Sequence, residues 1–150
     1  MFEVETQMTT FTIPSESEFI KVEDTSYAYR RFGEKTGVPV VFLVHFRGTI
    51  ENWDPNMVGL IAKERPVILF DNKGVGETNG QTPTTIAEMA QDAGKFIKAL
   101  GLDQVDILGF SIGGMVAQEL ALQEGNLDES SWQVPDQNLE LIQRWKCLKE

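Results

Sequence analysis

A serine in a tight, glycine-flanked turn is the residue of this sequence best placed to do chemistry. Residues 105–116 read as a short apolar strand, a G-x-S-x-G turn centred on Ser111, and the start of a helix. A nucleophilic serine needs such a turn because its hydroxyl must stand clear of the backbone, while the adjacent amides and the helix N-terminus face the carbonyl under attack. Gly109 and Gly113 let the strand and the helix pass close together, where side chains would collide. The stretch therefore indicates Ser111 as a nucleophile.

Two other loops, each directly after a predicted strand, are expected to contribute to the same site as Ser111. The apolar run Val40–Val44 leads directly into His45-Phe46-Arg47-Gly48, and residues 67–70 lead into the glycine-containing loop 71–76. Open α/β sheets build their sites beyond the carboxyl ends of parallel strands. We therefore expect both loops to lie beside Ser111 at one edge of a sheet.

The remaining elements supply the scaffold for these loops. A polar turn at 23–26 joins two half-buried strands into an antiparallel hairpin. Asp54-Pro55 opens a helix with Met57, Leu60 and Ile61 on its inner face, and Thr85 with Glu88 caps another that ends at Gly101. The predicted strands cover residues 18–22, 27–32, 40–44, 67–70 and 105–108, and a last helix runs from the serine turn to about residue 123. Such alternation predicts a mostly parallel sheet with right-handed crossovers and flanking helices.

With these three loops in order, the sequence resembles the α/β-hydrolase family from about Glu18 to about Glu124, which is the N-terminal half of that fold. It is most similar to esterases, lactonases and non-haem haloperoxidases that act on small molecules. The resemblance implies an α/β fold, a small-molecule ester or lactone as substrate, and neither a cofactor nor a metal.

The resemblance also implies roles for individual residues. Ser111 would be the nucleophile, and the backbone N–H groups of Phe46 and Ile112 would form the oxyanion hole. His45 would be structural, as would Gly109 and Gly113. One departure is that Phe46 stands where the family commonly has glycine, which bears on the donor geometry because glycine adopts backbone angles that phenylalanine resists.

A second departure concerns the base. The family supplies its acid and then its histidine after the nucleophile, but His45 is the one histidine in the chain and it precedes Ser111. Without a base the serine hydroxyl stays protonated and is a poor nucleophile. Two interpretations remain: a serine hydrolase known here by an incomplete sequence and impaired in this form, or a non-catalytic α/β domain that binds a ligand or a partner. A further alternative makes His45 the general base.

Composition limits the partners. The 150 residues carry 13 Lys and Arg against 23 Asp and Glu, a net charge of −10, so nucleic acid is not an expected partner. No apolar run approaches the roughly 20 residues that span a bilayer. A phosphate-loop reading of Gly74–Thr78 lacks the Lys-Ser/Thr ending. The single cysteine, Cys147, and the absence of a secretory signal favour the cytoplasm.

The domain organisation has three parts. Residues 1–17 read as a loose N-terminal segment, residues 18–124 as a partial α/β-hydrolase domain, and residues 125–150 as a divergent tail. Leu141, Trp145 and Leu148 predict one amphipathic helix in that tail, with no further strand. The strand at 105–108 would then have an unpaired edge unless the tail packs there, so we expect self-association through the sheet edge.

Overall fold

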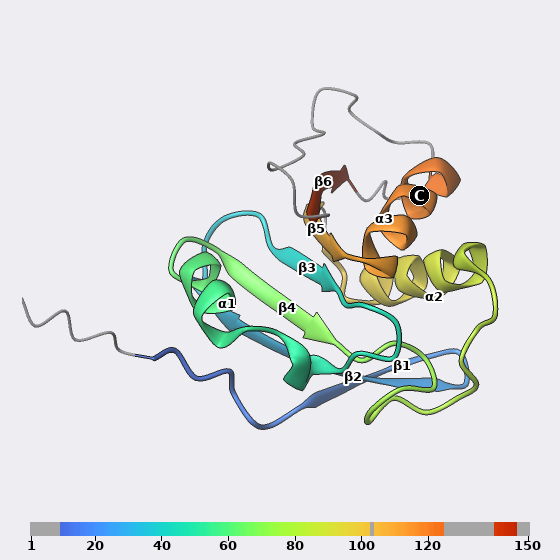
Figure 1. Cartoon of the computed structure of the whole chain (residues 1–150), viewed down its shortest axis with the longest axis horizontal. Helices are drawn as coiled ribbons and strands as arrows, with labels where there is room; N and C mark the ends of the chain where they lie inside the picture. The colour runs from blue at the N-terminus through green and yellow to red at the C-terminus, as the bar shows by residue number, and fades with distance from the viewer. Residues whose placement is uncertain (1–9, 103, 125–139, 147–150) are drawn as a thin grey trace, which may run out of the picture.

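A mixed six-stranded sheet with the strand order β1-β2-β4-β3-β5-β6 forms the centre of the protein (Figure 1). The structure is a computed structural model that describes residues 10–102, 104–124 and 140–146. The strands are β1 (Glu18–Val22), β2 (Thr25–Gly33), β3 (Val40–Leu43), β4 (Pro66–Phe70), β5 (Gln104–Phe110) and β6 (Glu140–Lys146). The 3₁₀ turn η1 (Ile50–Asn52) and the helices α1 (Pro55–Ala62), α2 (Ile86–Ala99) and α3 (Ile112–Glu124) complete the described elements.

Strand β3 lies at the middle of the parallel part of the sheet. Val41 is paired with Ile68 of β4 on one side and with Ile107 of β5 on the other, both in parallel register. The hairpin β1–β2 and the pair β2–β4 are antiparallel. The predicted antiparallel edge followed by parallel strands is confirmed, and the carboxyl ends of β3, β4 and β5 meet at one edge.

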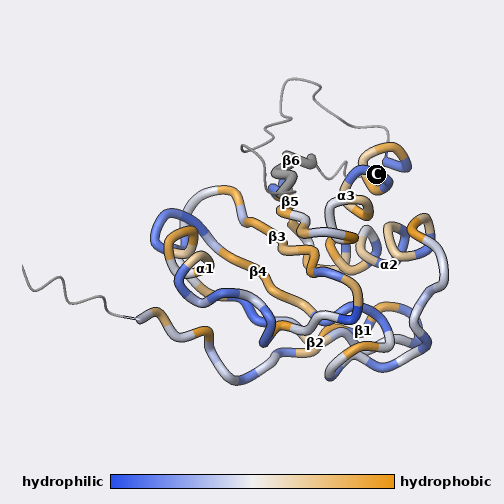
Figure 2. Tube along the Cα trace, in the orientation of Figure 1, coloured by the Kyte–Doolittle hydropathy of each residue, from blue (hydrophilic) through white to orange (hydrophobic). Residues whose placement is uncertain are grey.

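Two apolar cores, one on each face of the sheet, hold the layers together. Val41, Ile68 and Ile107 face α2 and α3, whereas Phe42, Leu69 and Leu108 face α1. Neighbouring residues of one strand alternate between the two faces, so a strand covered on both sides is apolar throughout. Figure 2 shows this as continuous hydrophobic colour along β3 and β4.

The predicted helix starts are confirmed by their caps. Asp54 Oδ1 accepts the Asn56 N–H at 2.8 Å, and Thr85 Oγ1 accepts the Glu88 N–H at 3.2 Å. Helix α2 ends at Ala99, and Gly101 follows the C-cap residue Leu100 with a φ of +69°, which suits a residue without a side chain.

The inner face predicted for α1 was partly wrong. Leu60 is 65% exposed, whereas Val58 and Ala62 are buried. A Cβ added at Gly59 would lie only 2.5 Å from Phe11 Cβ, so the small residue lets the N-terminal segment pack on the helix. Phe11 also meets Phe32 with ring centroids 5.7 Å apart, so the N-terminal segment packs on the domain at this point; residues 10–17 contain no helix or strand.

The tail differs most from expectation. Residues 140–146 form a strand, not a helix, and pair antiparallel with β5 along its whole length, from Gln104 opposite Lys146 to Phe110 opposite Glu140. The open N–H and C=O groups of β5 explain this choice, because a strand satisfies them and a helix does not. The β5 edge is thus covered by a strand of the tail, where the sequence left the edge open unless the tail packed there. Trp132, Cys147 and Leu148 lie outside the described residues.

Candidate active site

Ser111 occupies a strained turn between β5 and α3. Its φ is +57°, which is uncommon for a residue with a side chain. The turn is closed by a hydrogen bond from the Gly114 N–H to the Ser111 carbonyl oxygen at 2.9 Å. Ser111 is exposed although β5 before it is buried. Ser111 is thus an exposed residue in a left-handed turn directly before the first residue of α3.

The two glycines that flank Ser111 allow very close backbone contacts. A Cβ at Gly113 would lie 2.0 Å from the Leu43 carbonyl oxygen, and a Cβ at Gly109 would lie 2.5 Å from the Gly113 carbonyl oxygen. Real Cβ atoms do not approach backbone oxygen so closely, so both positions require glycine. We call the turn formed by residues 109–113 the elbow. The contact between Gly113 and Leu43 brings the elbow against the end of β3, where the loop 45–48 begins.

The loop 45–48 turns sharply beside the elbow. The Gly48 N–H donates to the His45 carbonyl oxygen at 2.9 Å, and Arg47, with φ of +58°, takes the left-handed position of the turn. Within the loop 45–48, Arg47 has the positive φ and Phe46 does not. Phenylalanine at position 46 therefore meets no backbone restriction there, and the absence of glycine does not distort the loop.

A small hollow lies between this loop and the elbow. It measures about 30 Å³, and its lining includes His45, Phe46, Ile112, Gly113 and Val116. We call it the elbow hollow. A space of this size can hold a water molecule. Phe46 and Ile112, the two predicted oxyanion residues, thus line one space, whereas Ser111 itself is not among the lining residues.

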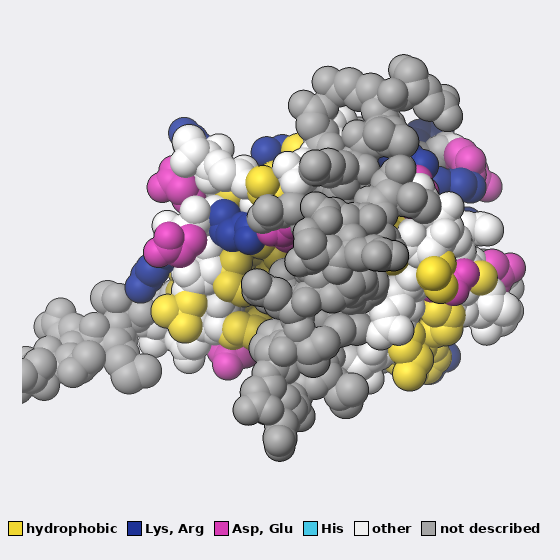
Figure 3. Space-filling model, turned by 90° about the horizontal axis from the view of Figure 1, so that it is seen from above, with side chains coloured by type: hydrophobic (Ala, Val, Ile, Leu, Met, Phe, Trp, Pro, Cys, Tyr) yellow, Lys and Arg dark blue, Asp and Glu magenta, His cyan; other side chains and the backbone are white. Residues whose placement is uncertain are grey.

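The rim around Ser111 is apolar. Phe46, Phe110 and Met115 are 55%, 41% and 60% exposed, and they come from the loop 45–48, the end of β5 and the first turn of α3. On a different face, seen from above in Figure 3, hydrophobic side chains likewise lie beside charged ones in the coloured part of the surface. The apolar rim suits the hydrocarbon part of a small ligand rather than a highly charged one.

The side chain of Asp71 anchors both the loop 45–48 and the loop that follows β4. Its side chain is 3% exposed, and its Oδ1 accepts the Ile50 N–H at 2.9 Å while Oδ2 accepts the Glu77 N–H at 3.0 Å. Ile50 follows the loop 45–48, and Glu77 closes the loop after β4. A Cβ at Gly76 would lie 2.3 Å from Asp71 Oδ2, so glycine makes room for the carboxylate. This carboxylate is structural, as is that of Asp106, which pairs with Arg65.

The comparisons with known proteins agree with this geometry. A family model described as the alpha/beta hydrolase fold matches residues 38–130, more than half of the chain. The chain belongs to the α/β-hydrolase family. A solved α/β-hydrolase fold protein from Chitinophaga pinensis is 44% identical, with a TM-score of 0.70, over 73% of this chain and 40% of that one. Est816, described as an N-acyl homoserine lactone degrading enzyme, is 31% identical, with a TM-score of 0.62, over 72% of this chain and 41% of that one.

Two curated members of the family match a similar region. The putative carbamate hydrolase RutD of Azorhizobium caulinodans is 33% identical over 87 residues, which are 57% of this chain and 32% of that protein. The putative non-heme bromoperoxidase BpoC of Mycobacterium tuberculosis is 33% identical over 97 residues, which are 64% of this chain and 37% of that protein. The chain therefore spans about a third of the length of the curated α/β-hydrolases that it matches.

His45, the one histidine of this α/β-hydrolase chain, lies close to the elbow. Its ring meets Phe110 edge-on with centroids 6.0 Å apart, and its Cε1 and Nε2 would lie 3.0 and 3.1 Å from a Cβ at Gly48. The ring is thus folded back over Gly48 and contributes to the wall of the elbow hollow. This packing suits the structural role implied by the family, and the part of the chain that the structure describes adds no other histidine.

Sequence reasoning missed three contributors to the site. Arg47 carries the positive φ of the loop, and its guanidinium carbon lies 5.6 Å from the centre of the Phe46 ring. Lys73 and Pro83 line the elbow hollow from the loop after β4. No sequence signal marks Arg47 as the left-handed residue, because arginine has no preference for that region.

The described residues contain no group of three or more His, Cys, Asp or Glu side chains arranged to hold a metal ion. Nor does any helix among them have the length and hydropathy to cross a membrane.

Proposed function

We propose that this chain carries the nucleophile and oxyanion part of a serine hydrolase that acts on small-molecule esters or lactones. The observation that carries the proposal is the strained, exposed Ser111 beside a hollow lined by Phe46 and Ile112. Ser111 Oγ would attack the acyl carbonyl, and the two backbone N–H groups would hold the alkoxide that develops. The alcohol would leave with a proton, and water would then cleave the acyl-enzyme.

The names of the relatives support this class of substrate. One relative is a putative carbamate hydrolase and another degrades N-acyl homoserine lactones, so both names describe attack on an acyl carbon bearing oxygen or nitrogen. The apolar rim of Phe46, Phe110 and Met115 would contact the hydrocarbon part of such a substrate.

We also propose that this chain is impaired as a catalyst. Oxyanion donors each contribute roughly 3–4 kcal/mol to lowering the barrier, but a protonated serine hydroxyl remains a weak nucleophile. No histidine follows Ser111 in the sequence. We further propose that the protein is located in the cytoplasm.

Labelling with a fluorophosphonate probe tests the proposal. We expect slow modification of Ser111 that is lost in Ser111→Ala. Its rate should rise continuously with pH, about tenfold per pH unit, because the reactive alkoxide fraction grows in that proportion. Peptide mapping identifies the labelled serine, and the heat-unfolded chain gives the rate of an unstructured serine.

Two results would contradict the proposal in different ways. Fast labelling at neutral pH that disappears in His45→Gln would make His45 the general base. Ser111 labelling no faster than in the unfolded chain, even at high pH, would show that the elbow does not activate its serine.

The second of those results would favour the other candidate, a non-catalytic α/β-hydrolase domain that binds a ligand or a partner. The single histidine, placed before Ser111, is the observation that keeps this candidate open.

A further inference from the structure

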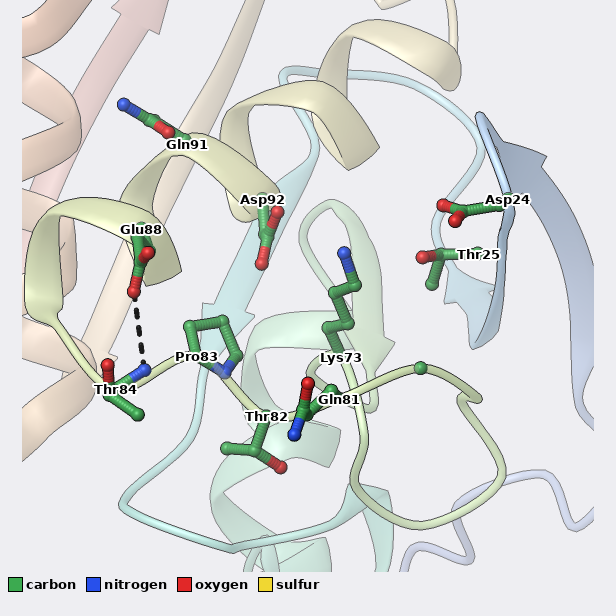
Figure 4. A pocket seen from close by; sticks show the side chains of 11 residues that line it. Asp24, Thr25, Lys73, Gln81, Thr82, Pro83, Thr84, Glu88, Gln91 and Asp92 are labelled. Carbon is green, nitrogen blue, oxygen red and sulfur yellow. Dashed lines mark hydrogen bonds between the residues drawn. The ribbon is translucent and has the colours of Figure 1, made fainter.

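A second, larger hollow adjoins the elbow hollow and is lined mostly by polar and charged side chains. It measures about 610 Å³ and lies between the β1–β2 turn, the loop that follows β4, and the first turns of α2 (Figure 4). We call it the polar hollow; its charged and amide-bearing side chains are Asp24, Lys73, Gln81, Glu88, Gln91 and Asp92. The volume is within the range of small-molecule sites, about 300–1,000 Å³.

The polar hollow shares a wall with the candidate active site. Lys73, Thr82 and Pro83 line both spaces. A molecule held in the polar hollow would therefore contact the outer side of the segment whose inner side closes the elbow hollow.

Lys73 is held in a defined position in this wall. Its stem lies across Gly80, where an added Cβ would be 3.0 Å from Lys73 Cε and 3.1 Å from Cγ. The Gly74 N–H bonds to the Asn79 carbonyl oxygen at 3.0 Å, and Asn79 Oδ1 accepts the Ser26 N–H at 2.7 Å. The loop is thus anchored to β2. Figure 4 shows the Lys73 ammonium group directed into the hollow, with Asp92 on one side and Asp24 on the other.

The charges that face each other here do not pair. Within residues 10–102 and 104–124, Lys73, Asp24 and Asp92 form no ion pair and no side-chain hydrogen bond, although Glu23 and Lys95 nearby do pair, at 3.1 Å. Glu88 is engaged differently, since its Oε2 accepts the Thr84 N–H at 3.3 Å. A cation and two carboxylates therefore stand around an open space that a complementary ligand would fill.

Asp92 is a partly buried carboxylate with other carboxylates nearby, and its raised pKa reflects this. Burial raises the pKa of Asp92, and Lys73 and Lys95 lower it by less than that. The pKa of Tyr27 is raised as well, first by its burial and then by Asp92, Glu23 and Asp24. This end of the molecule is therefore negative despite Lys73.

The lining restricts the chemistry of a ligand. Three carboxylates stand against one ammonium group, which favours a ligand with net positive charge. No aromatic side chain lines the hollow, so a nucleobase or a sugar ring has no face to stack on. The single cation gives one place for a carboxylate, and Asp24 and Asp92 give places for cationic groups.

We propose that the polar hollow binds a cationic α-amino acid of the arginine type, with its carboxylate on Lys73 and its cationic groups toward Asp24 and Asp92. This ligand neutralises each unpaired charge of the lining at once. The inference is independent of the chemistry of Ser111.

Titration of the full chain with three matched compounds tests the proposal. L-Arginine carries both charges, agmatine lacks the carboxylate, and L-citrulline replaces the guanidinium by a neutral group of the same shape. We expect arginine to shift the backbone amide resonances of Lys73 and Asp92 and to bind about tenfold more tightly than either analogue, since each analogue loses one charge-assisted contact.

Variants separate the two ends of the ligand. Lys73→Met should weaken arginine binding about tenfold and leave agmatine unchanged or improved, whereas Asp92→Asn should weaken both. Lys63→Met and Asp54→Asn, the same changes at the exposed residues that flank α1, should leave binding unchanged and control for net charge. Ser111→Ala should also bind arginine normally, so failure here is distinct from failure of the proposed hydrolase function.

Equal binding of arginine and agmatine would overturn the proposal, because it would show only attraction of cations to an acidic surface. The absence of any shift at Lys73 and Asp92 with all three compounds would overturn it as well.

Discussion

Asp71 is the residue on which the positions of both site loops depend. One buried carboxylate accepts an N–H from Ile50 and another from Glu77. An amide in its place has a single acceptor oxygen, and its NH₂ group would face the second N–H. The loop 45–48 and the loop after β4 would then lose their common anchor.

We therefore predict that Asp71→Asn lowers the free energy of unfolding by about 1–3 kcal/mol, the cost of leaving a buried N–H without an acceptor. Denaturant unfolding measures the change, and the amide resonances of Ile50 and Glu77 should report it locally. Asp54→Asn is the matched control. Asp54 is an exposed helix cap where asparagine serves equally well, so its change should stay within about 0.5 kcal/mol. Equal effects of the two substitutions would show that Asp71 is not an anchor.

At the scale of elements, the elbow depends on helix α3 starting against the end of β3. Gly113 is the point of contact, because a Cβ at this position would lie only 2.0 Å from the Leu43 carbonyl oxygen. We predict that Gly113→Ala destabilises the fold by about 3 kcal/mol or more, because backbone must move to accommodate the methyl group. Thermal unfolding measures this, and Ser111 labelling by the fluorophosphonate should fall with it.

Gly94→Ala provides the control for this substitution within another helix. Its Cβ would lie 3.0 Å from Leu120 Cδ1, the end of a flexible side chain. Alanine gains about 1 kcal/mol of helix propensity over glycine, so Gly94→Ala should be neutral or stabilising. A comparable loss of stability in both variants would mean that Gly113 has no special contact.

The elements that sequence predicted and those it did not differ in how local their causes are. The strand before Ser111, the Thr85 cap and the turn at Ser111 are each set by residues adjacent in the chain, and all three are confirmed. Strand β6 depends instead on the open edge of β5, some thirty residues earlier, so tertiary pairing overrides the helical spacing of Leu141 and Trp145. The packing of Phe11 against Gly59 of α1 is likewise a contact between distant segments, which no local pattern indicates.

Features of the site also differ in whether their causes are local or long-range in sequence. The glycines around Ser111 follow from the turn itself, whereas the anchoring of two loops by Asp71 joins residues that are 21 apart in sequence. The polar hollow needs the β1–β2 turn, α2 and the loop after β4 to come together, and no pattern within any one of these segments indicates it.

At the scale of the whole molecule, the sheet ends at β6, which covers β5 through backbone pairing over seven residue pairs. Removing residues 126–150 would expose the N–H and C=O groups of β5, a template for pairing with another chain. We predict that the shortened chain associates or aggregates, while the full chain stays less associated at the same concentration. Sedimentation of both chains at matched concentration measures this.

A single substitution within β6 tests whether strand pairing is responsible, rather than some other property of the tail. Gln143 lies opposite Ile107 in the middle of the pair. Proline at this position introduces a ring and removes an N–H, which the interior of a paired strand rejects, whereas threonine keeps the backbone and favours strands. We therefore expect Gln143→Pro to associate like the shortened chain and Gln143→Thr to behave like the full chain. A monodisperse monomer from both the shortened chain and Gln143→Pro, with undiminished cooperative melting, would show that the β5 edge needs no cover.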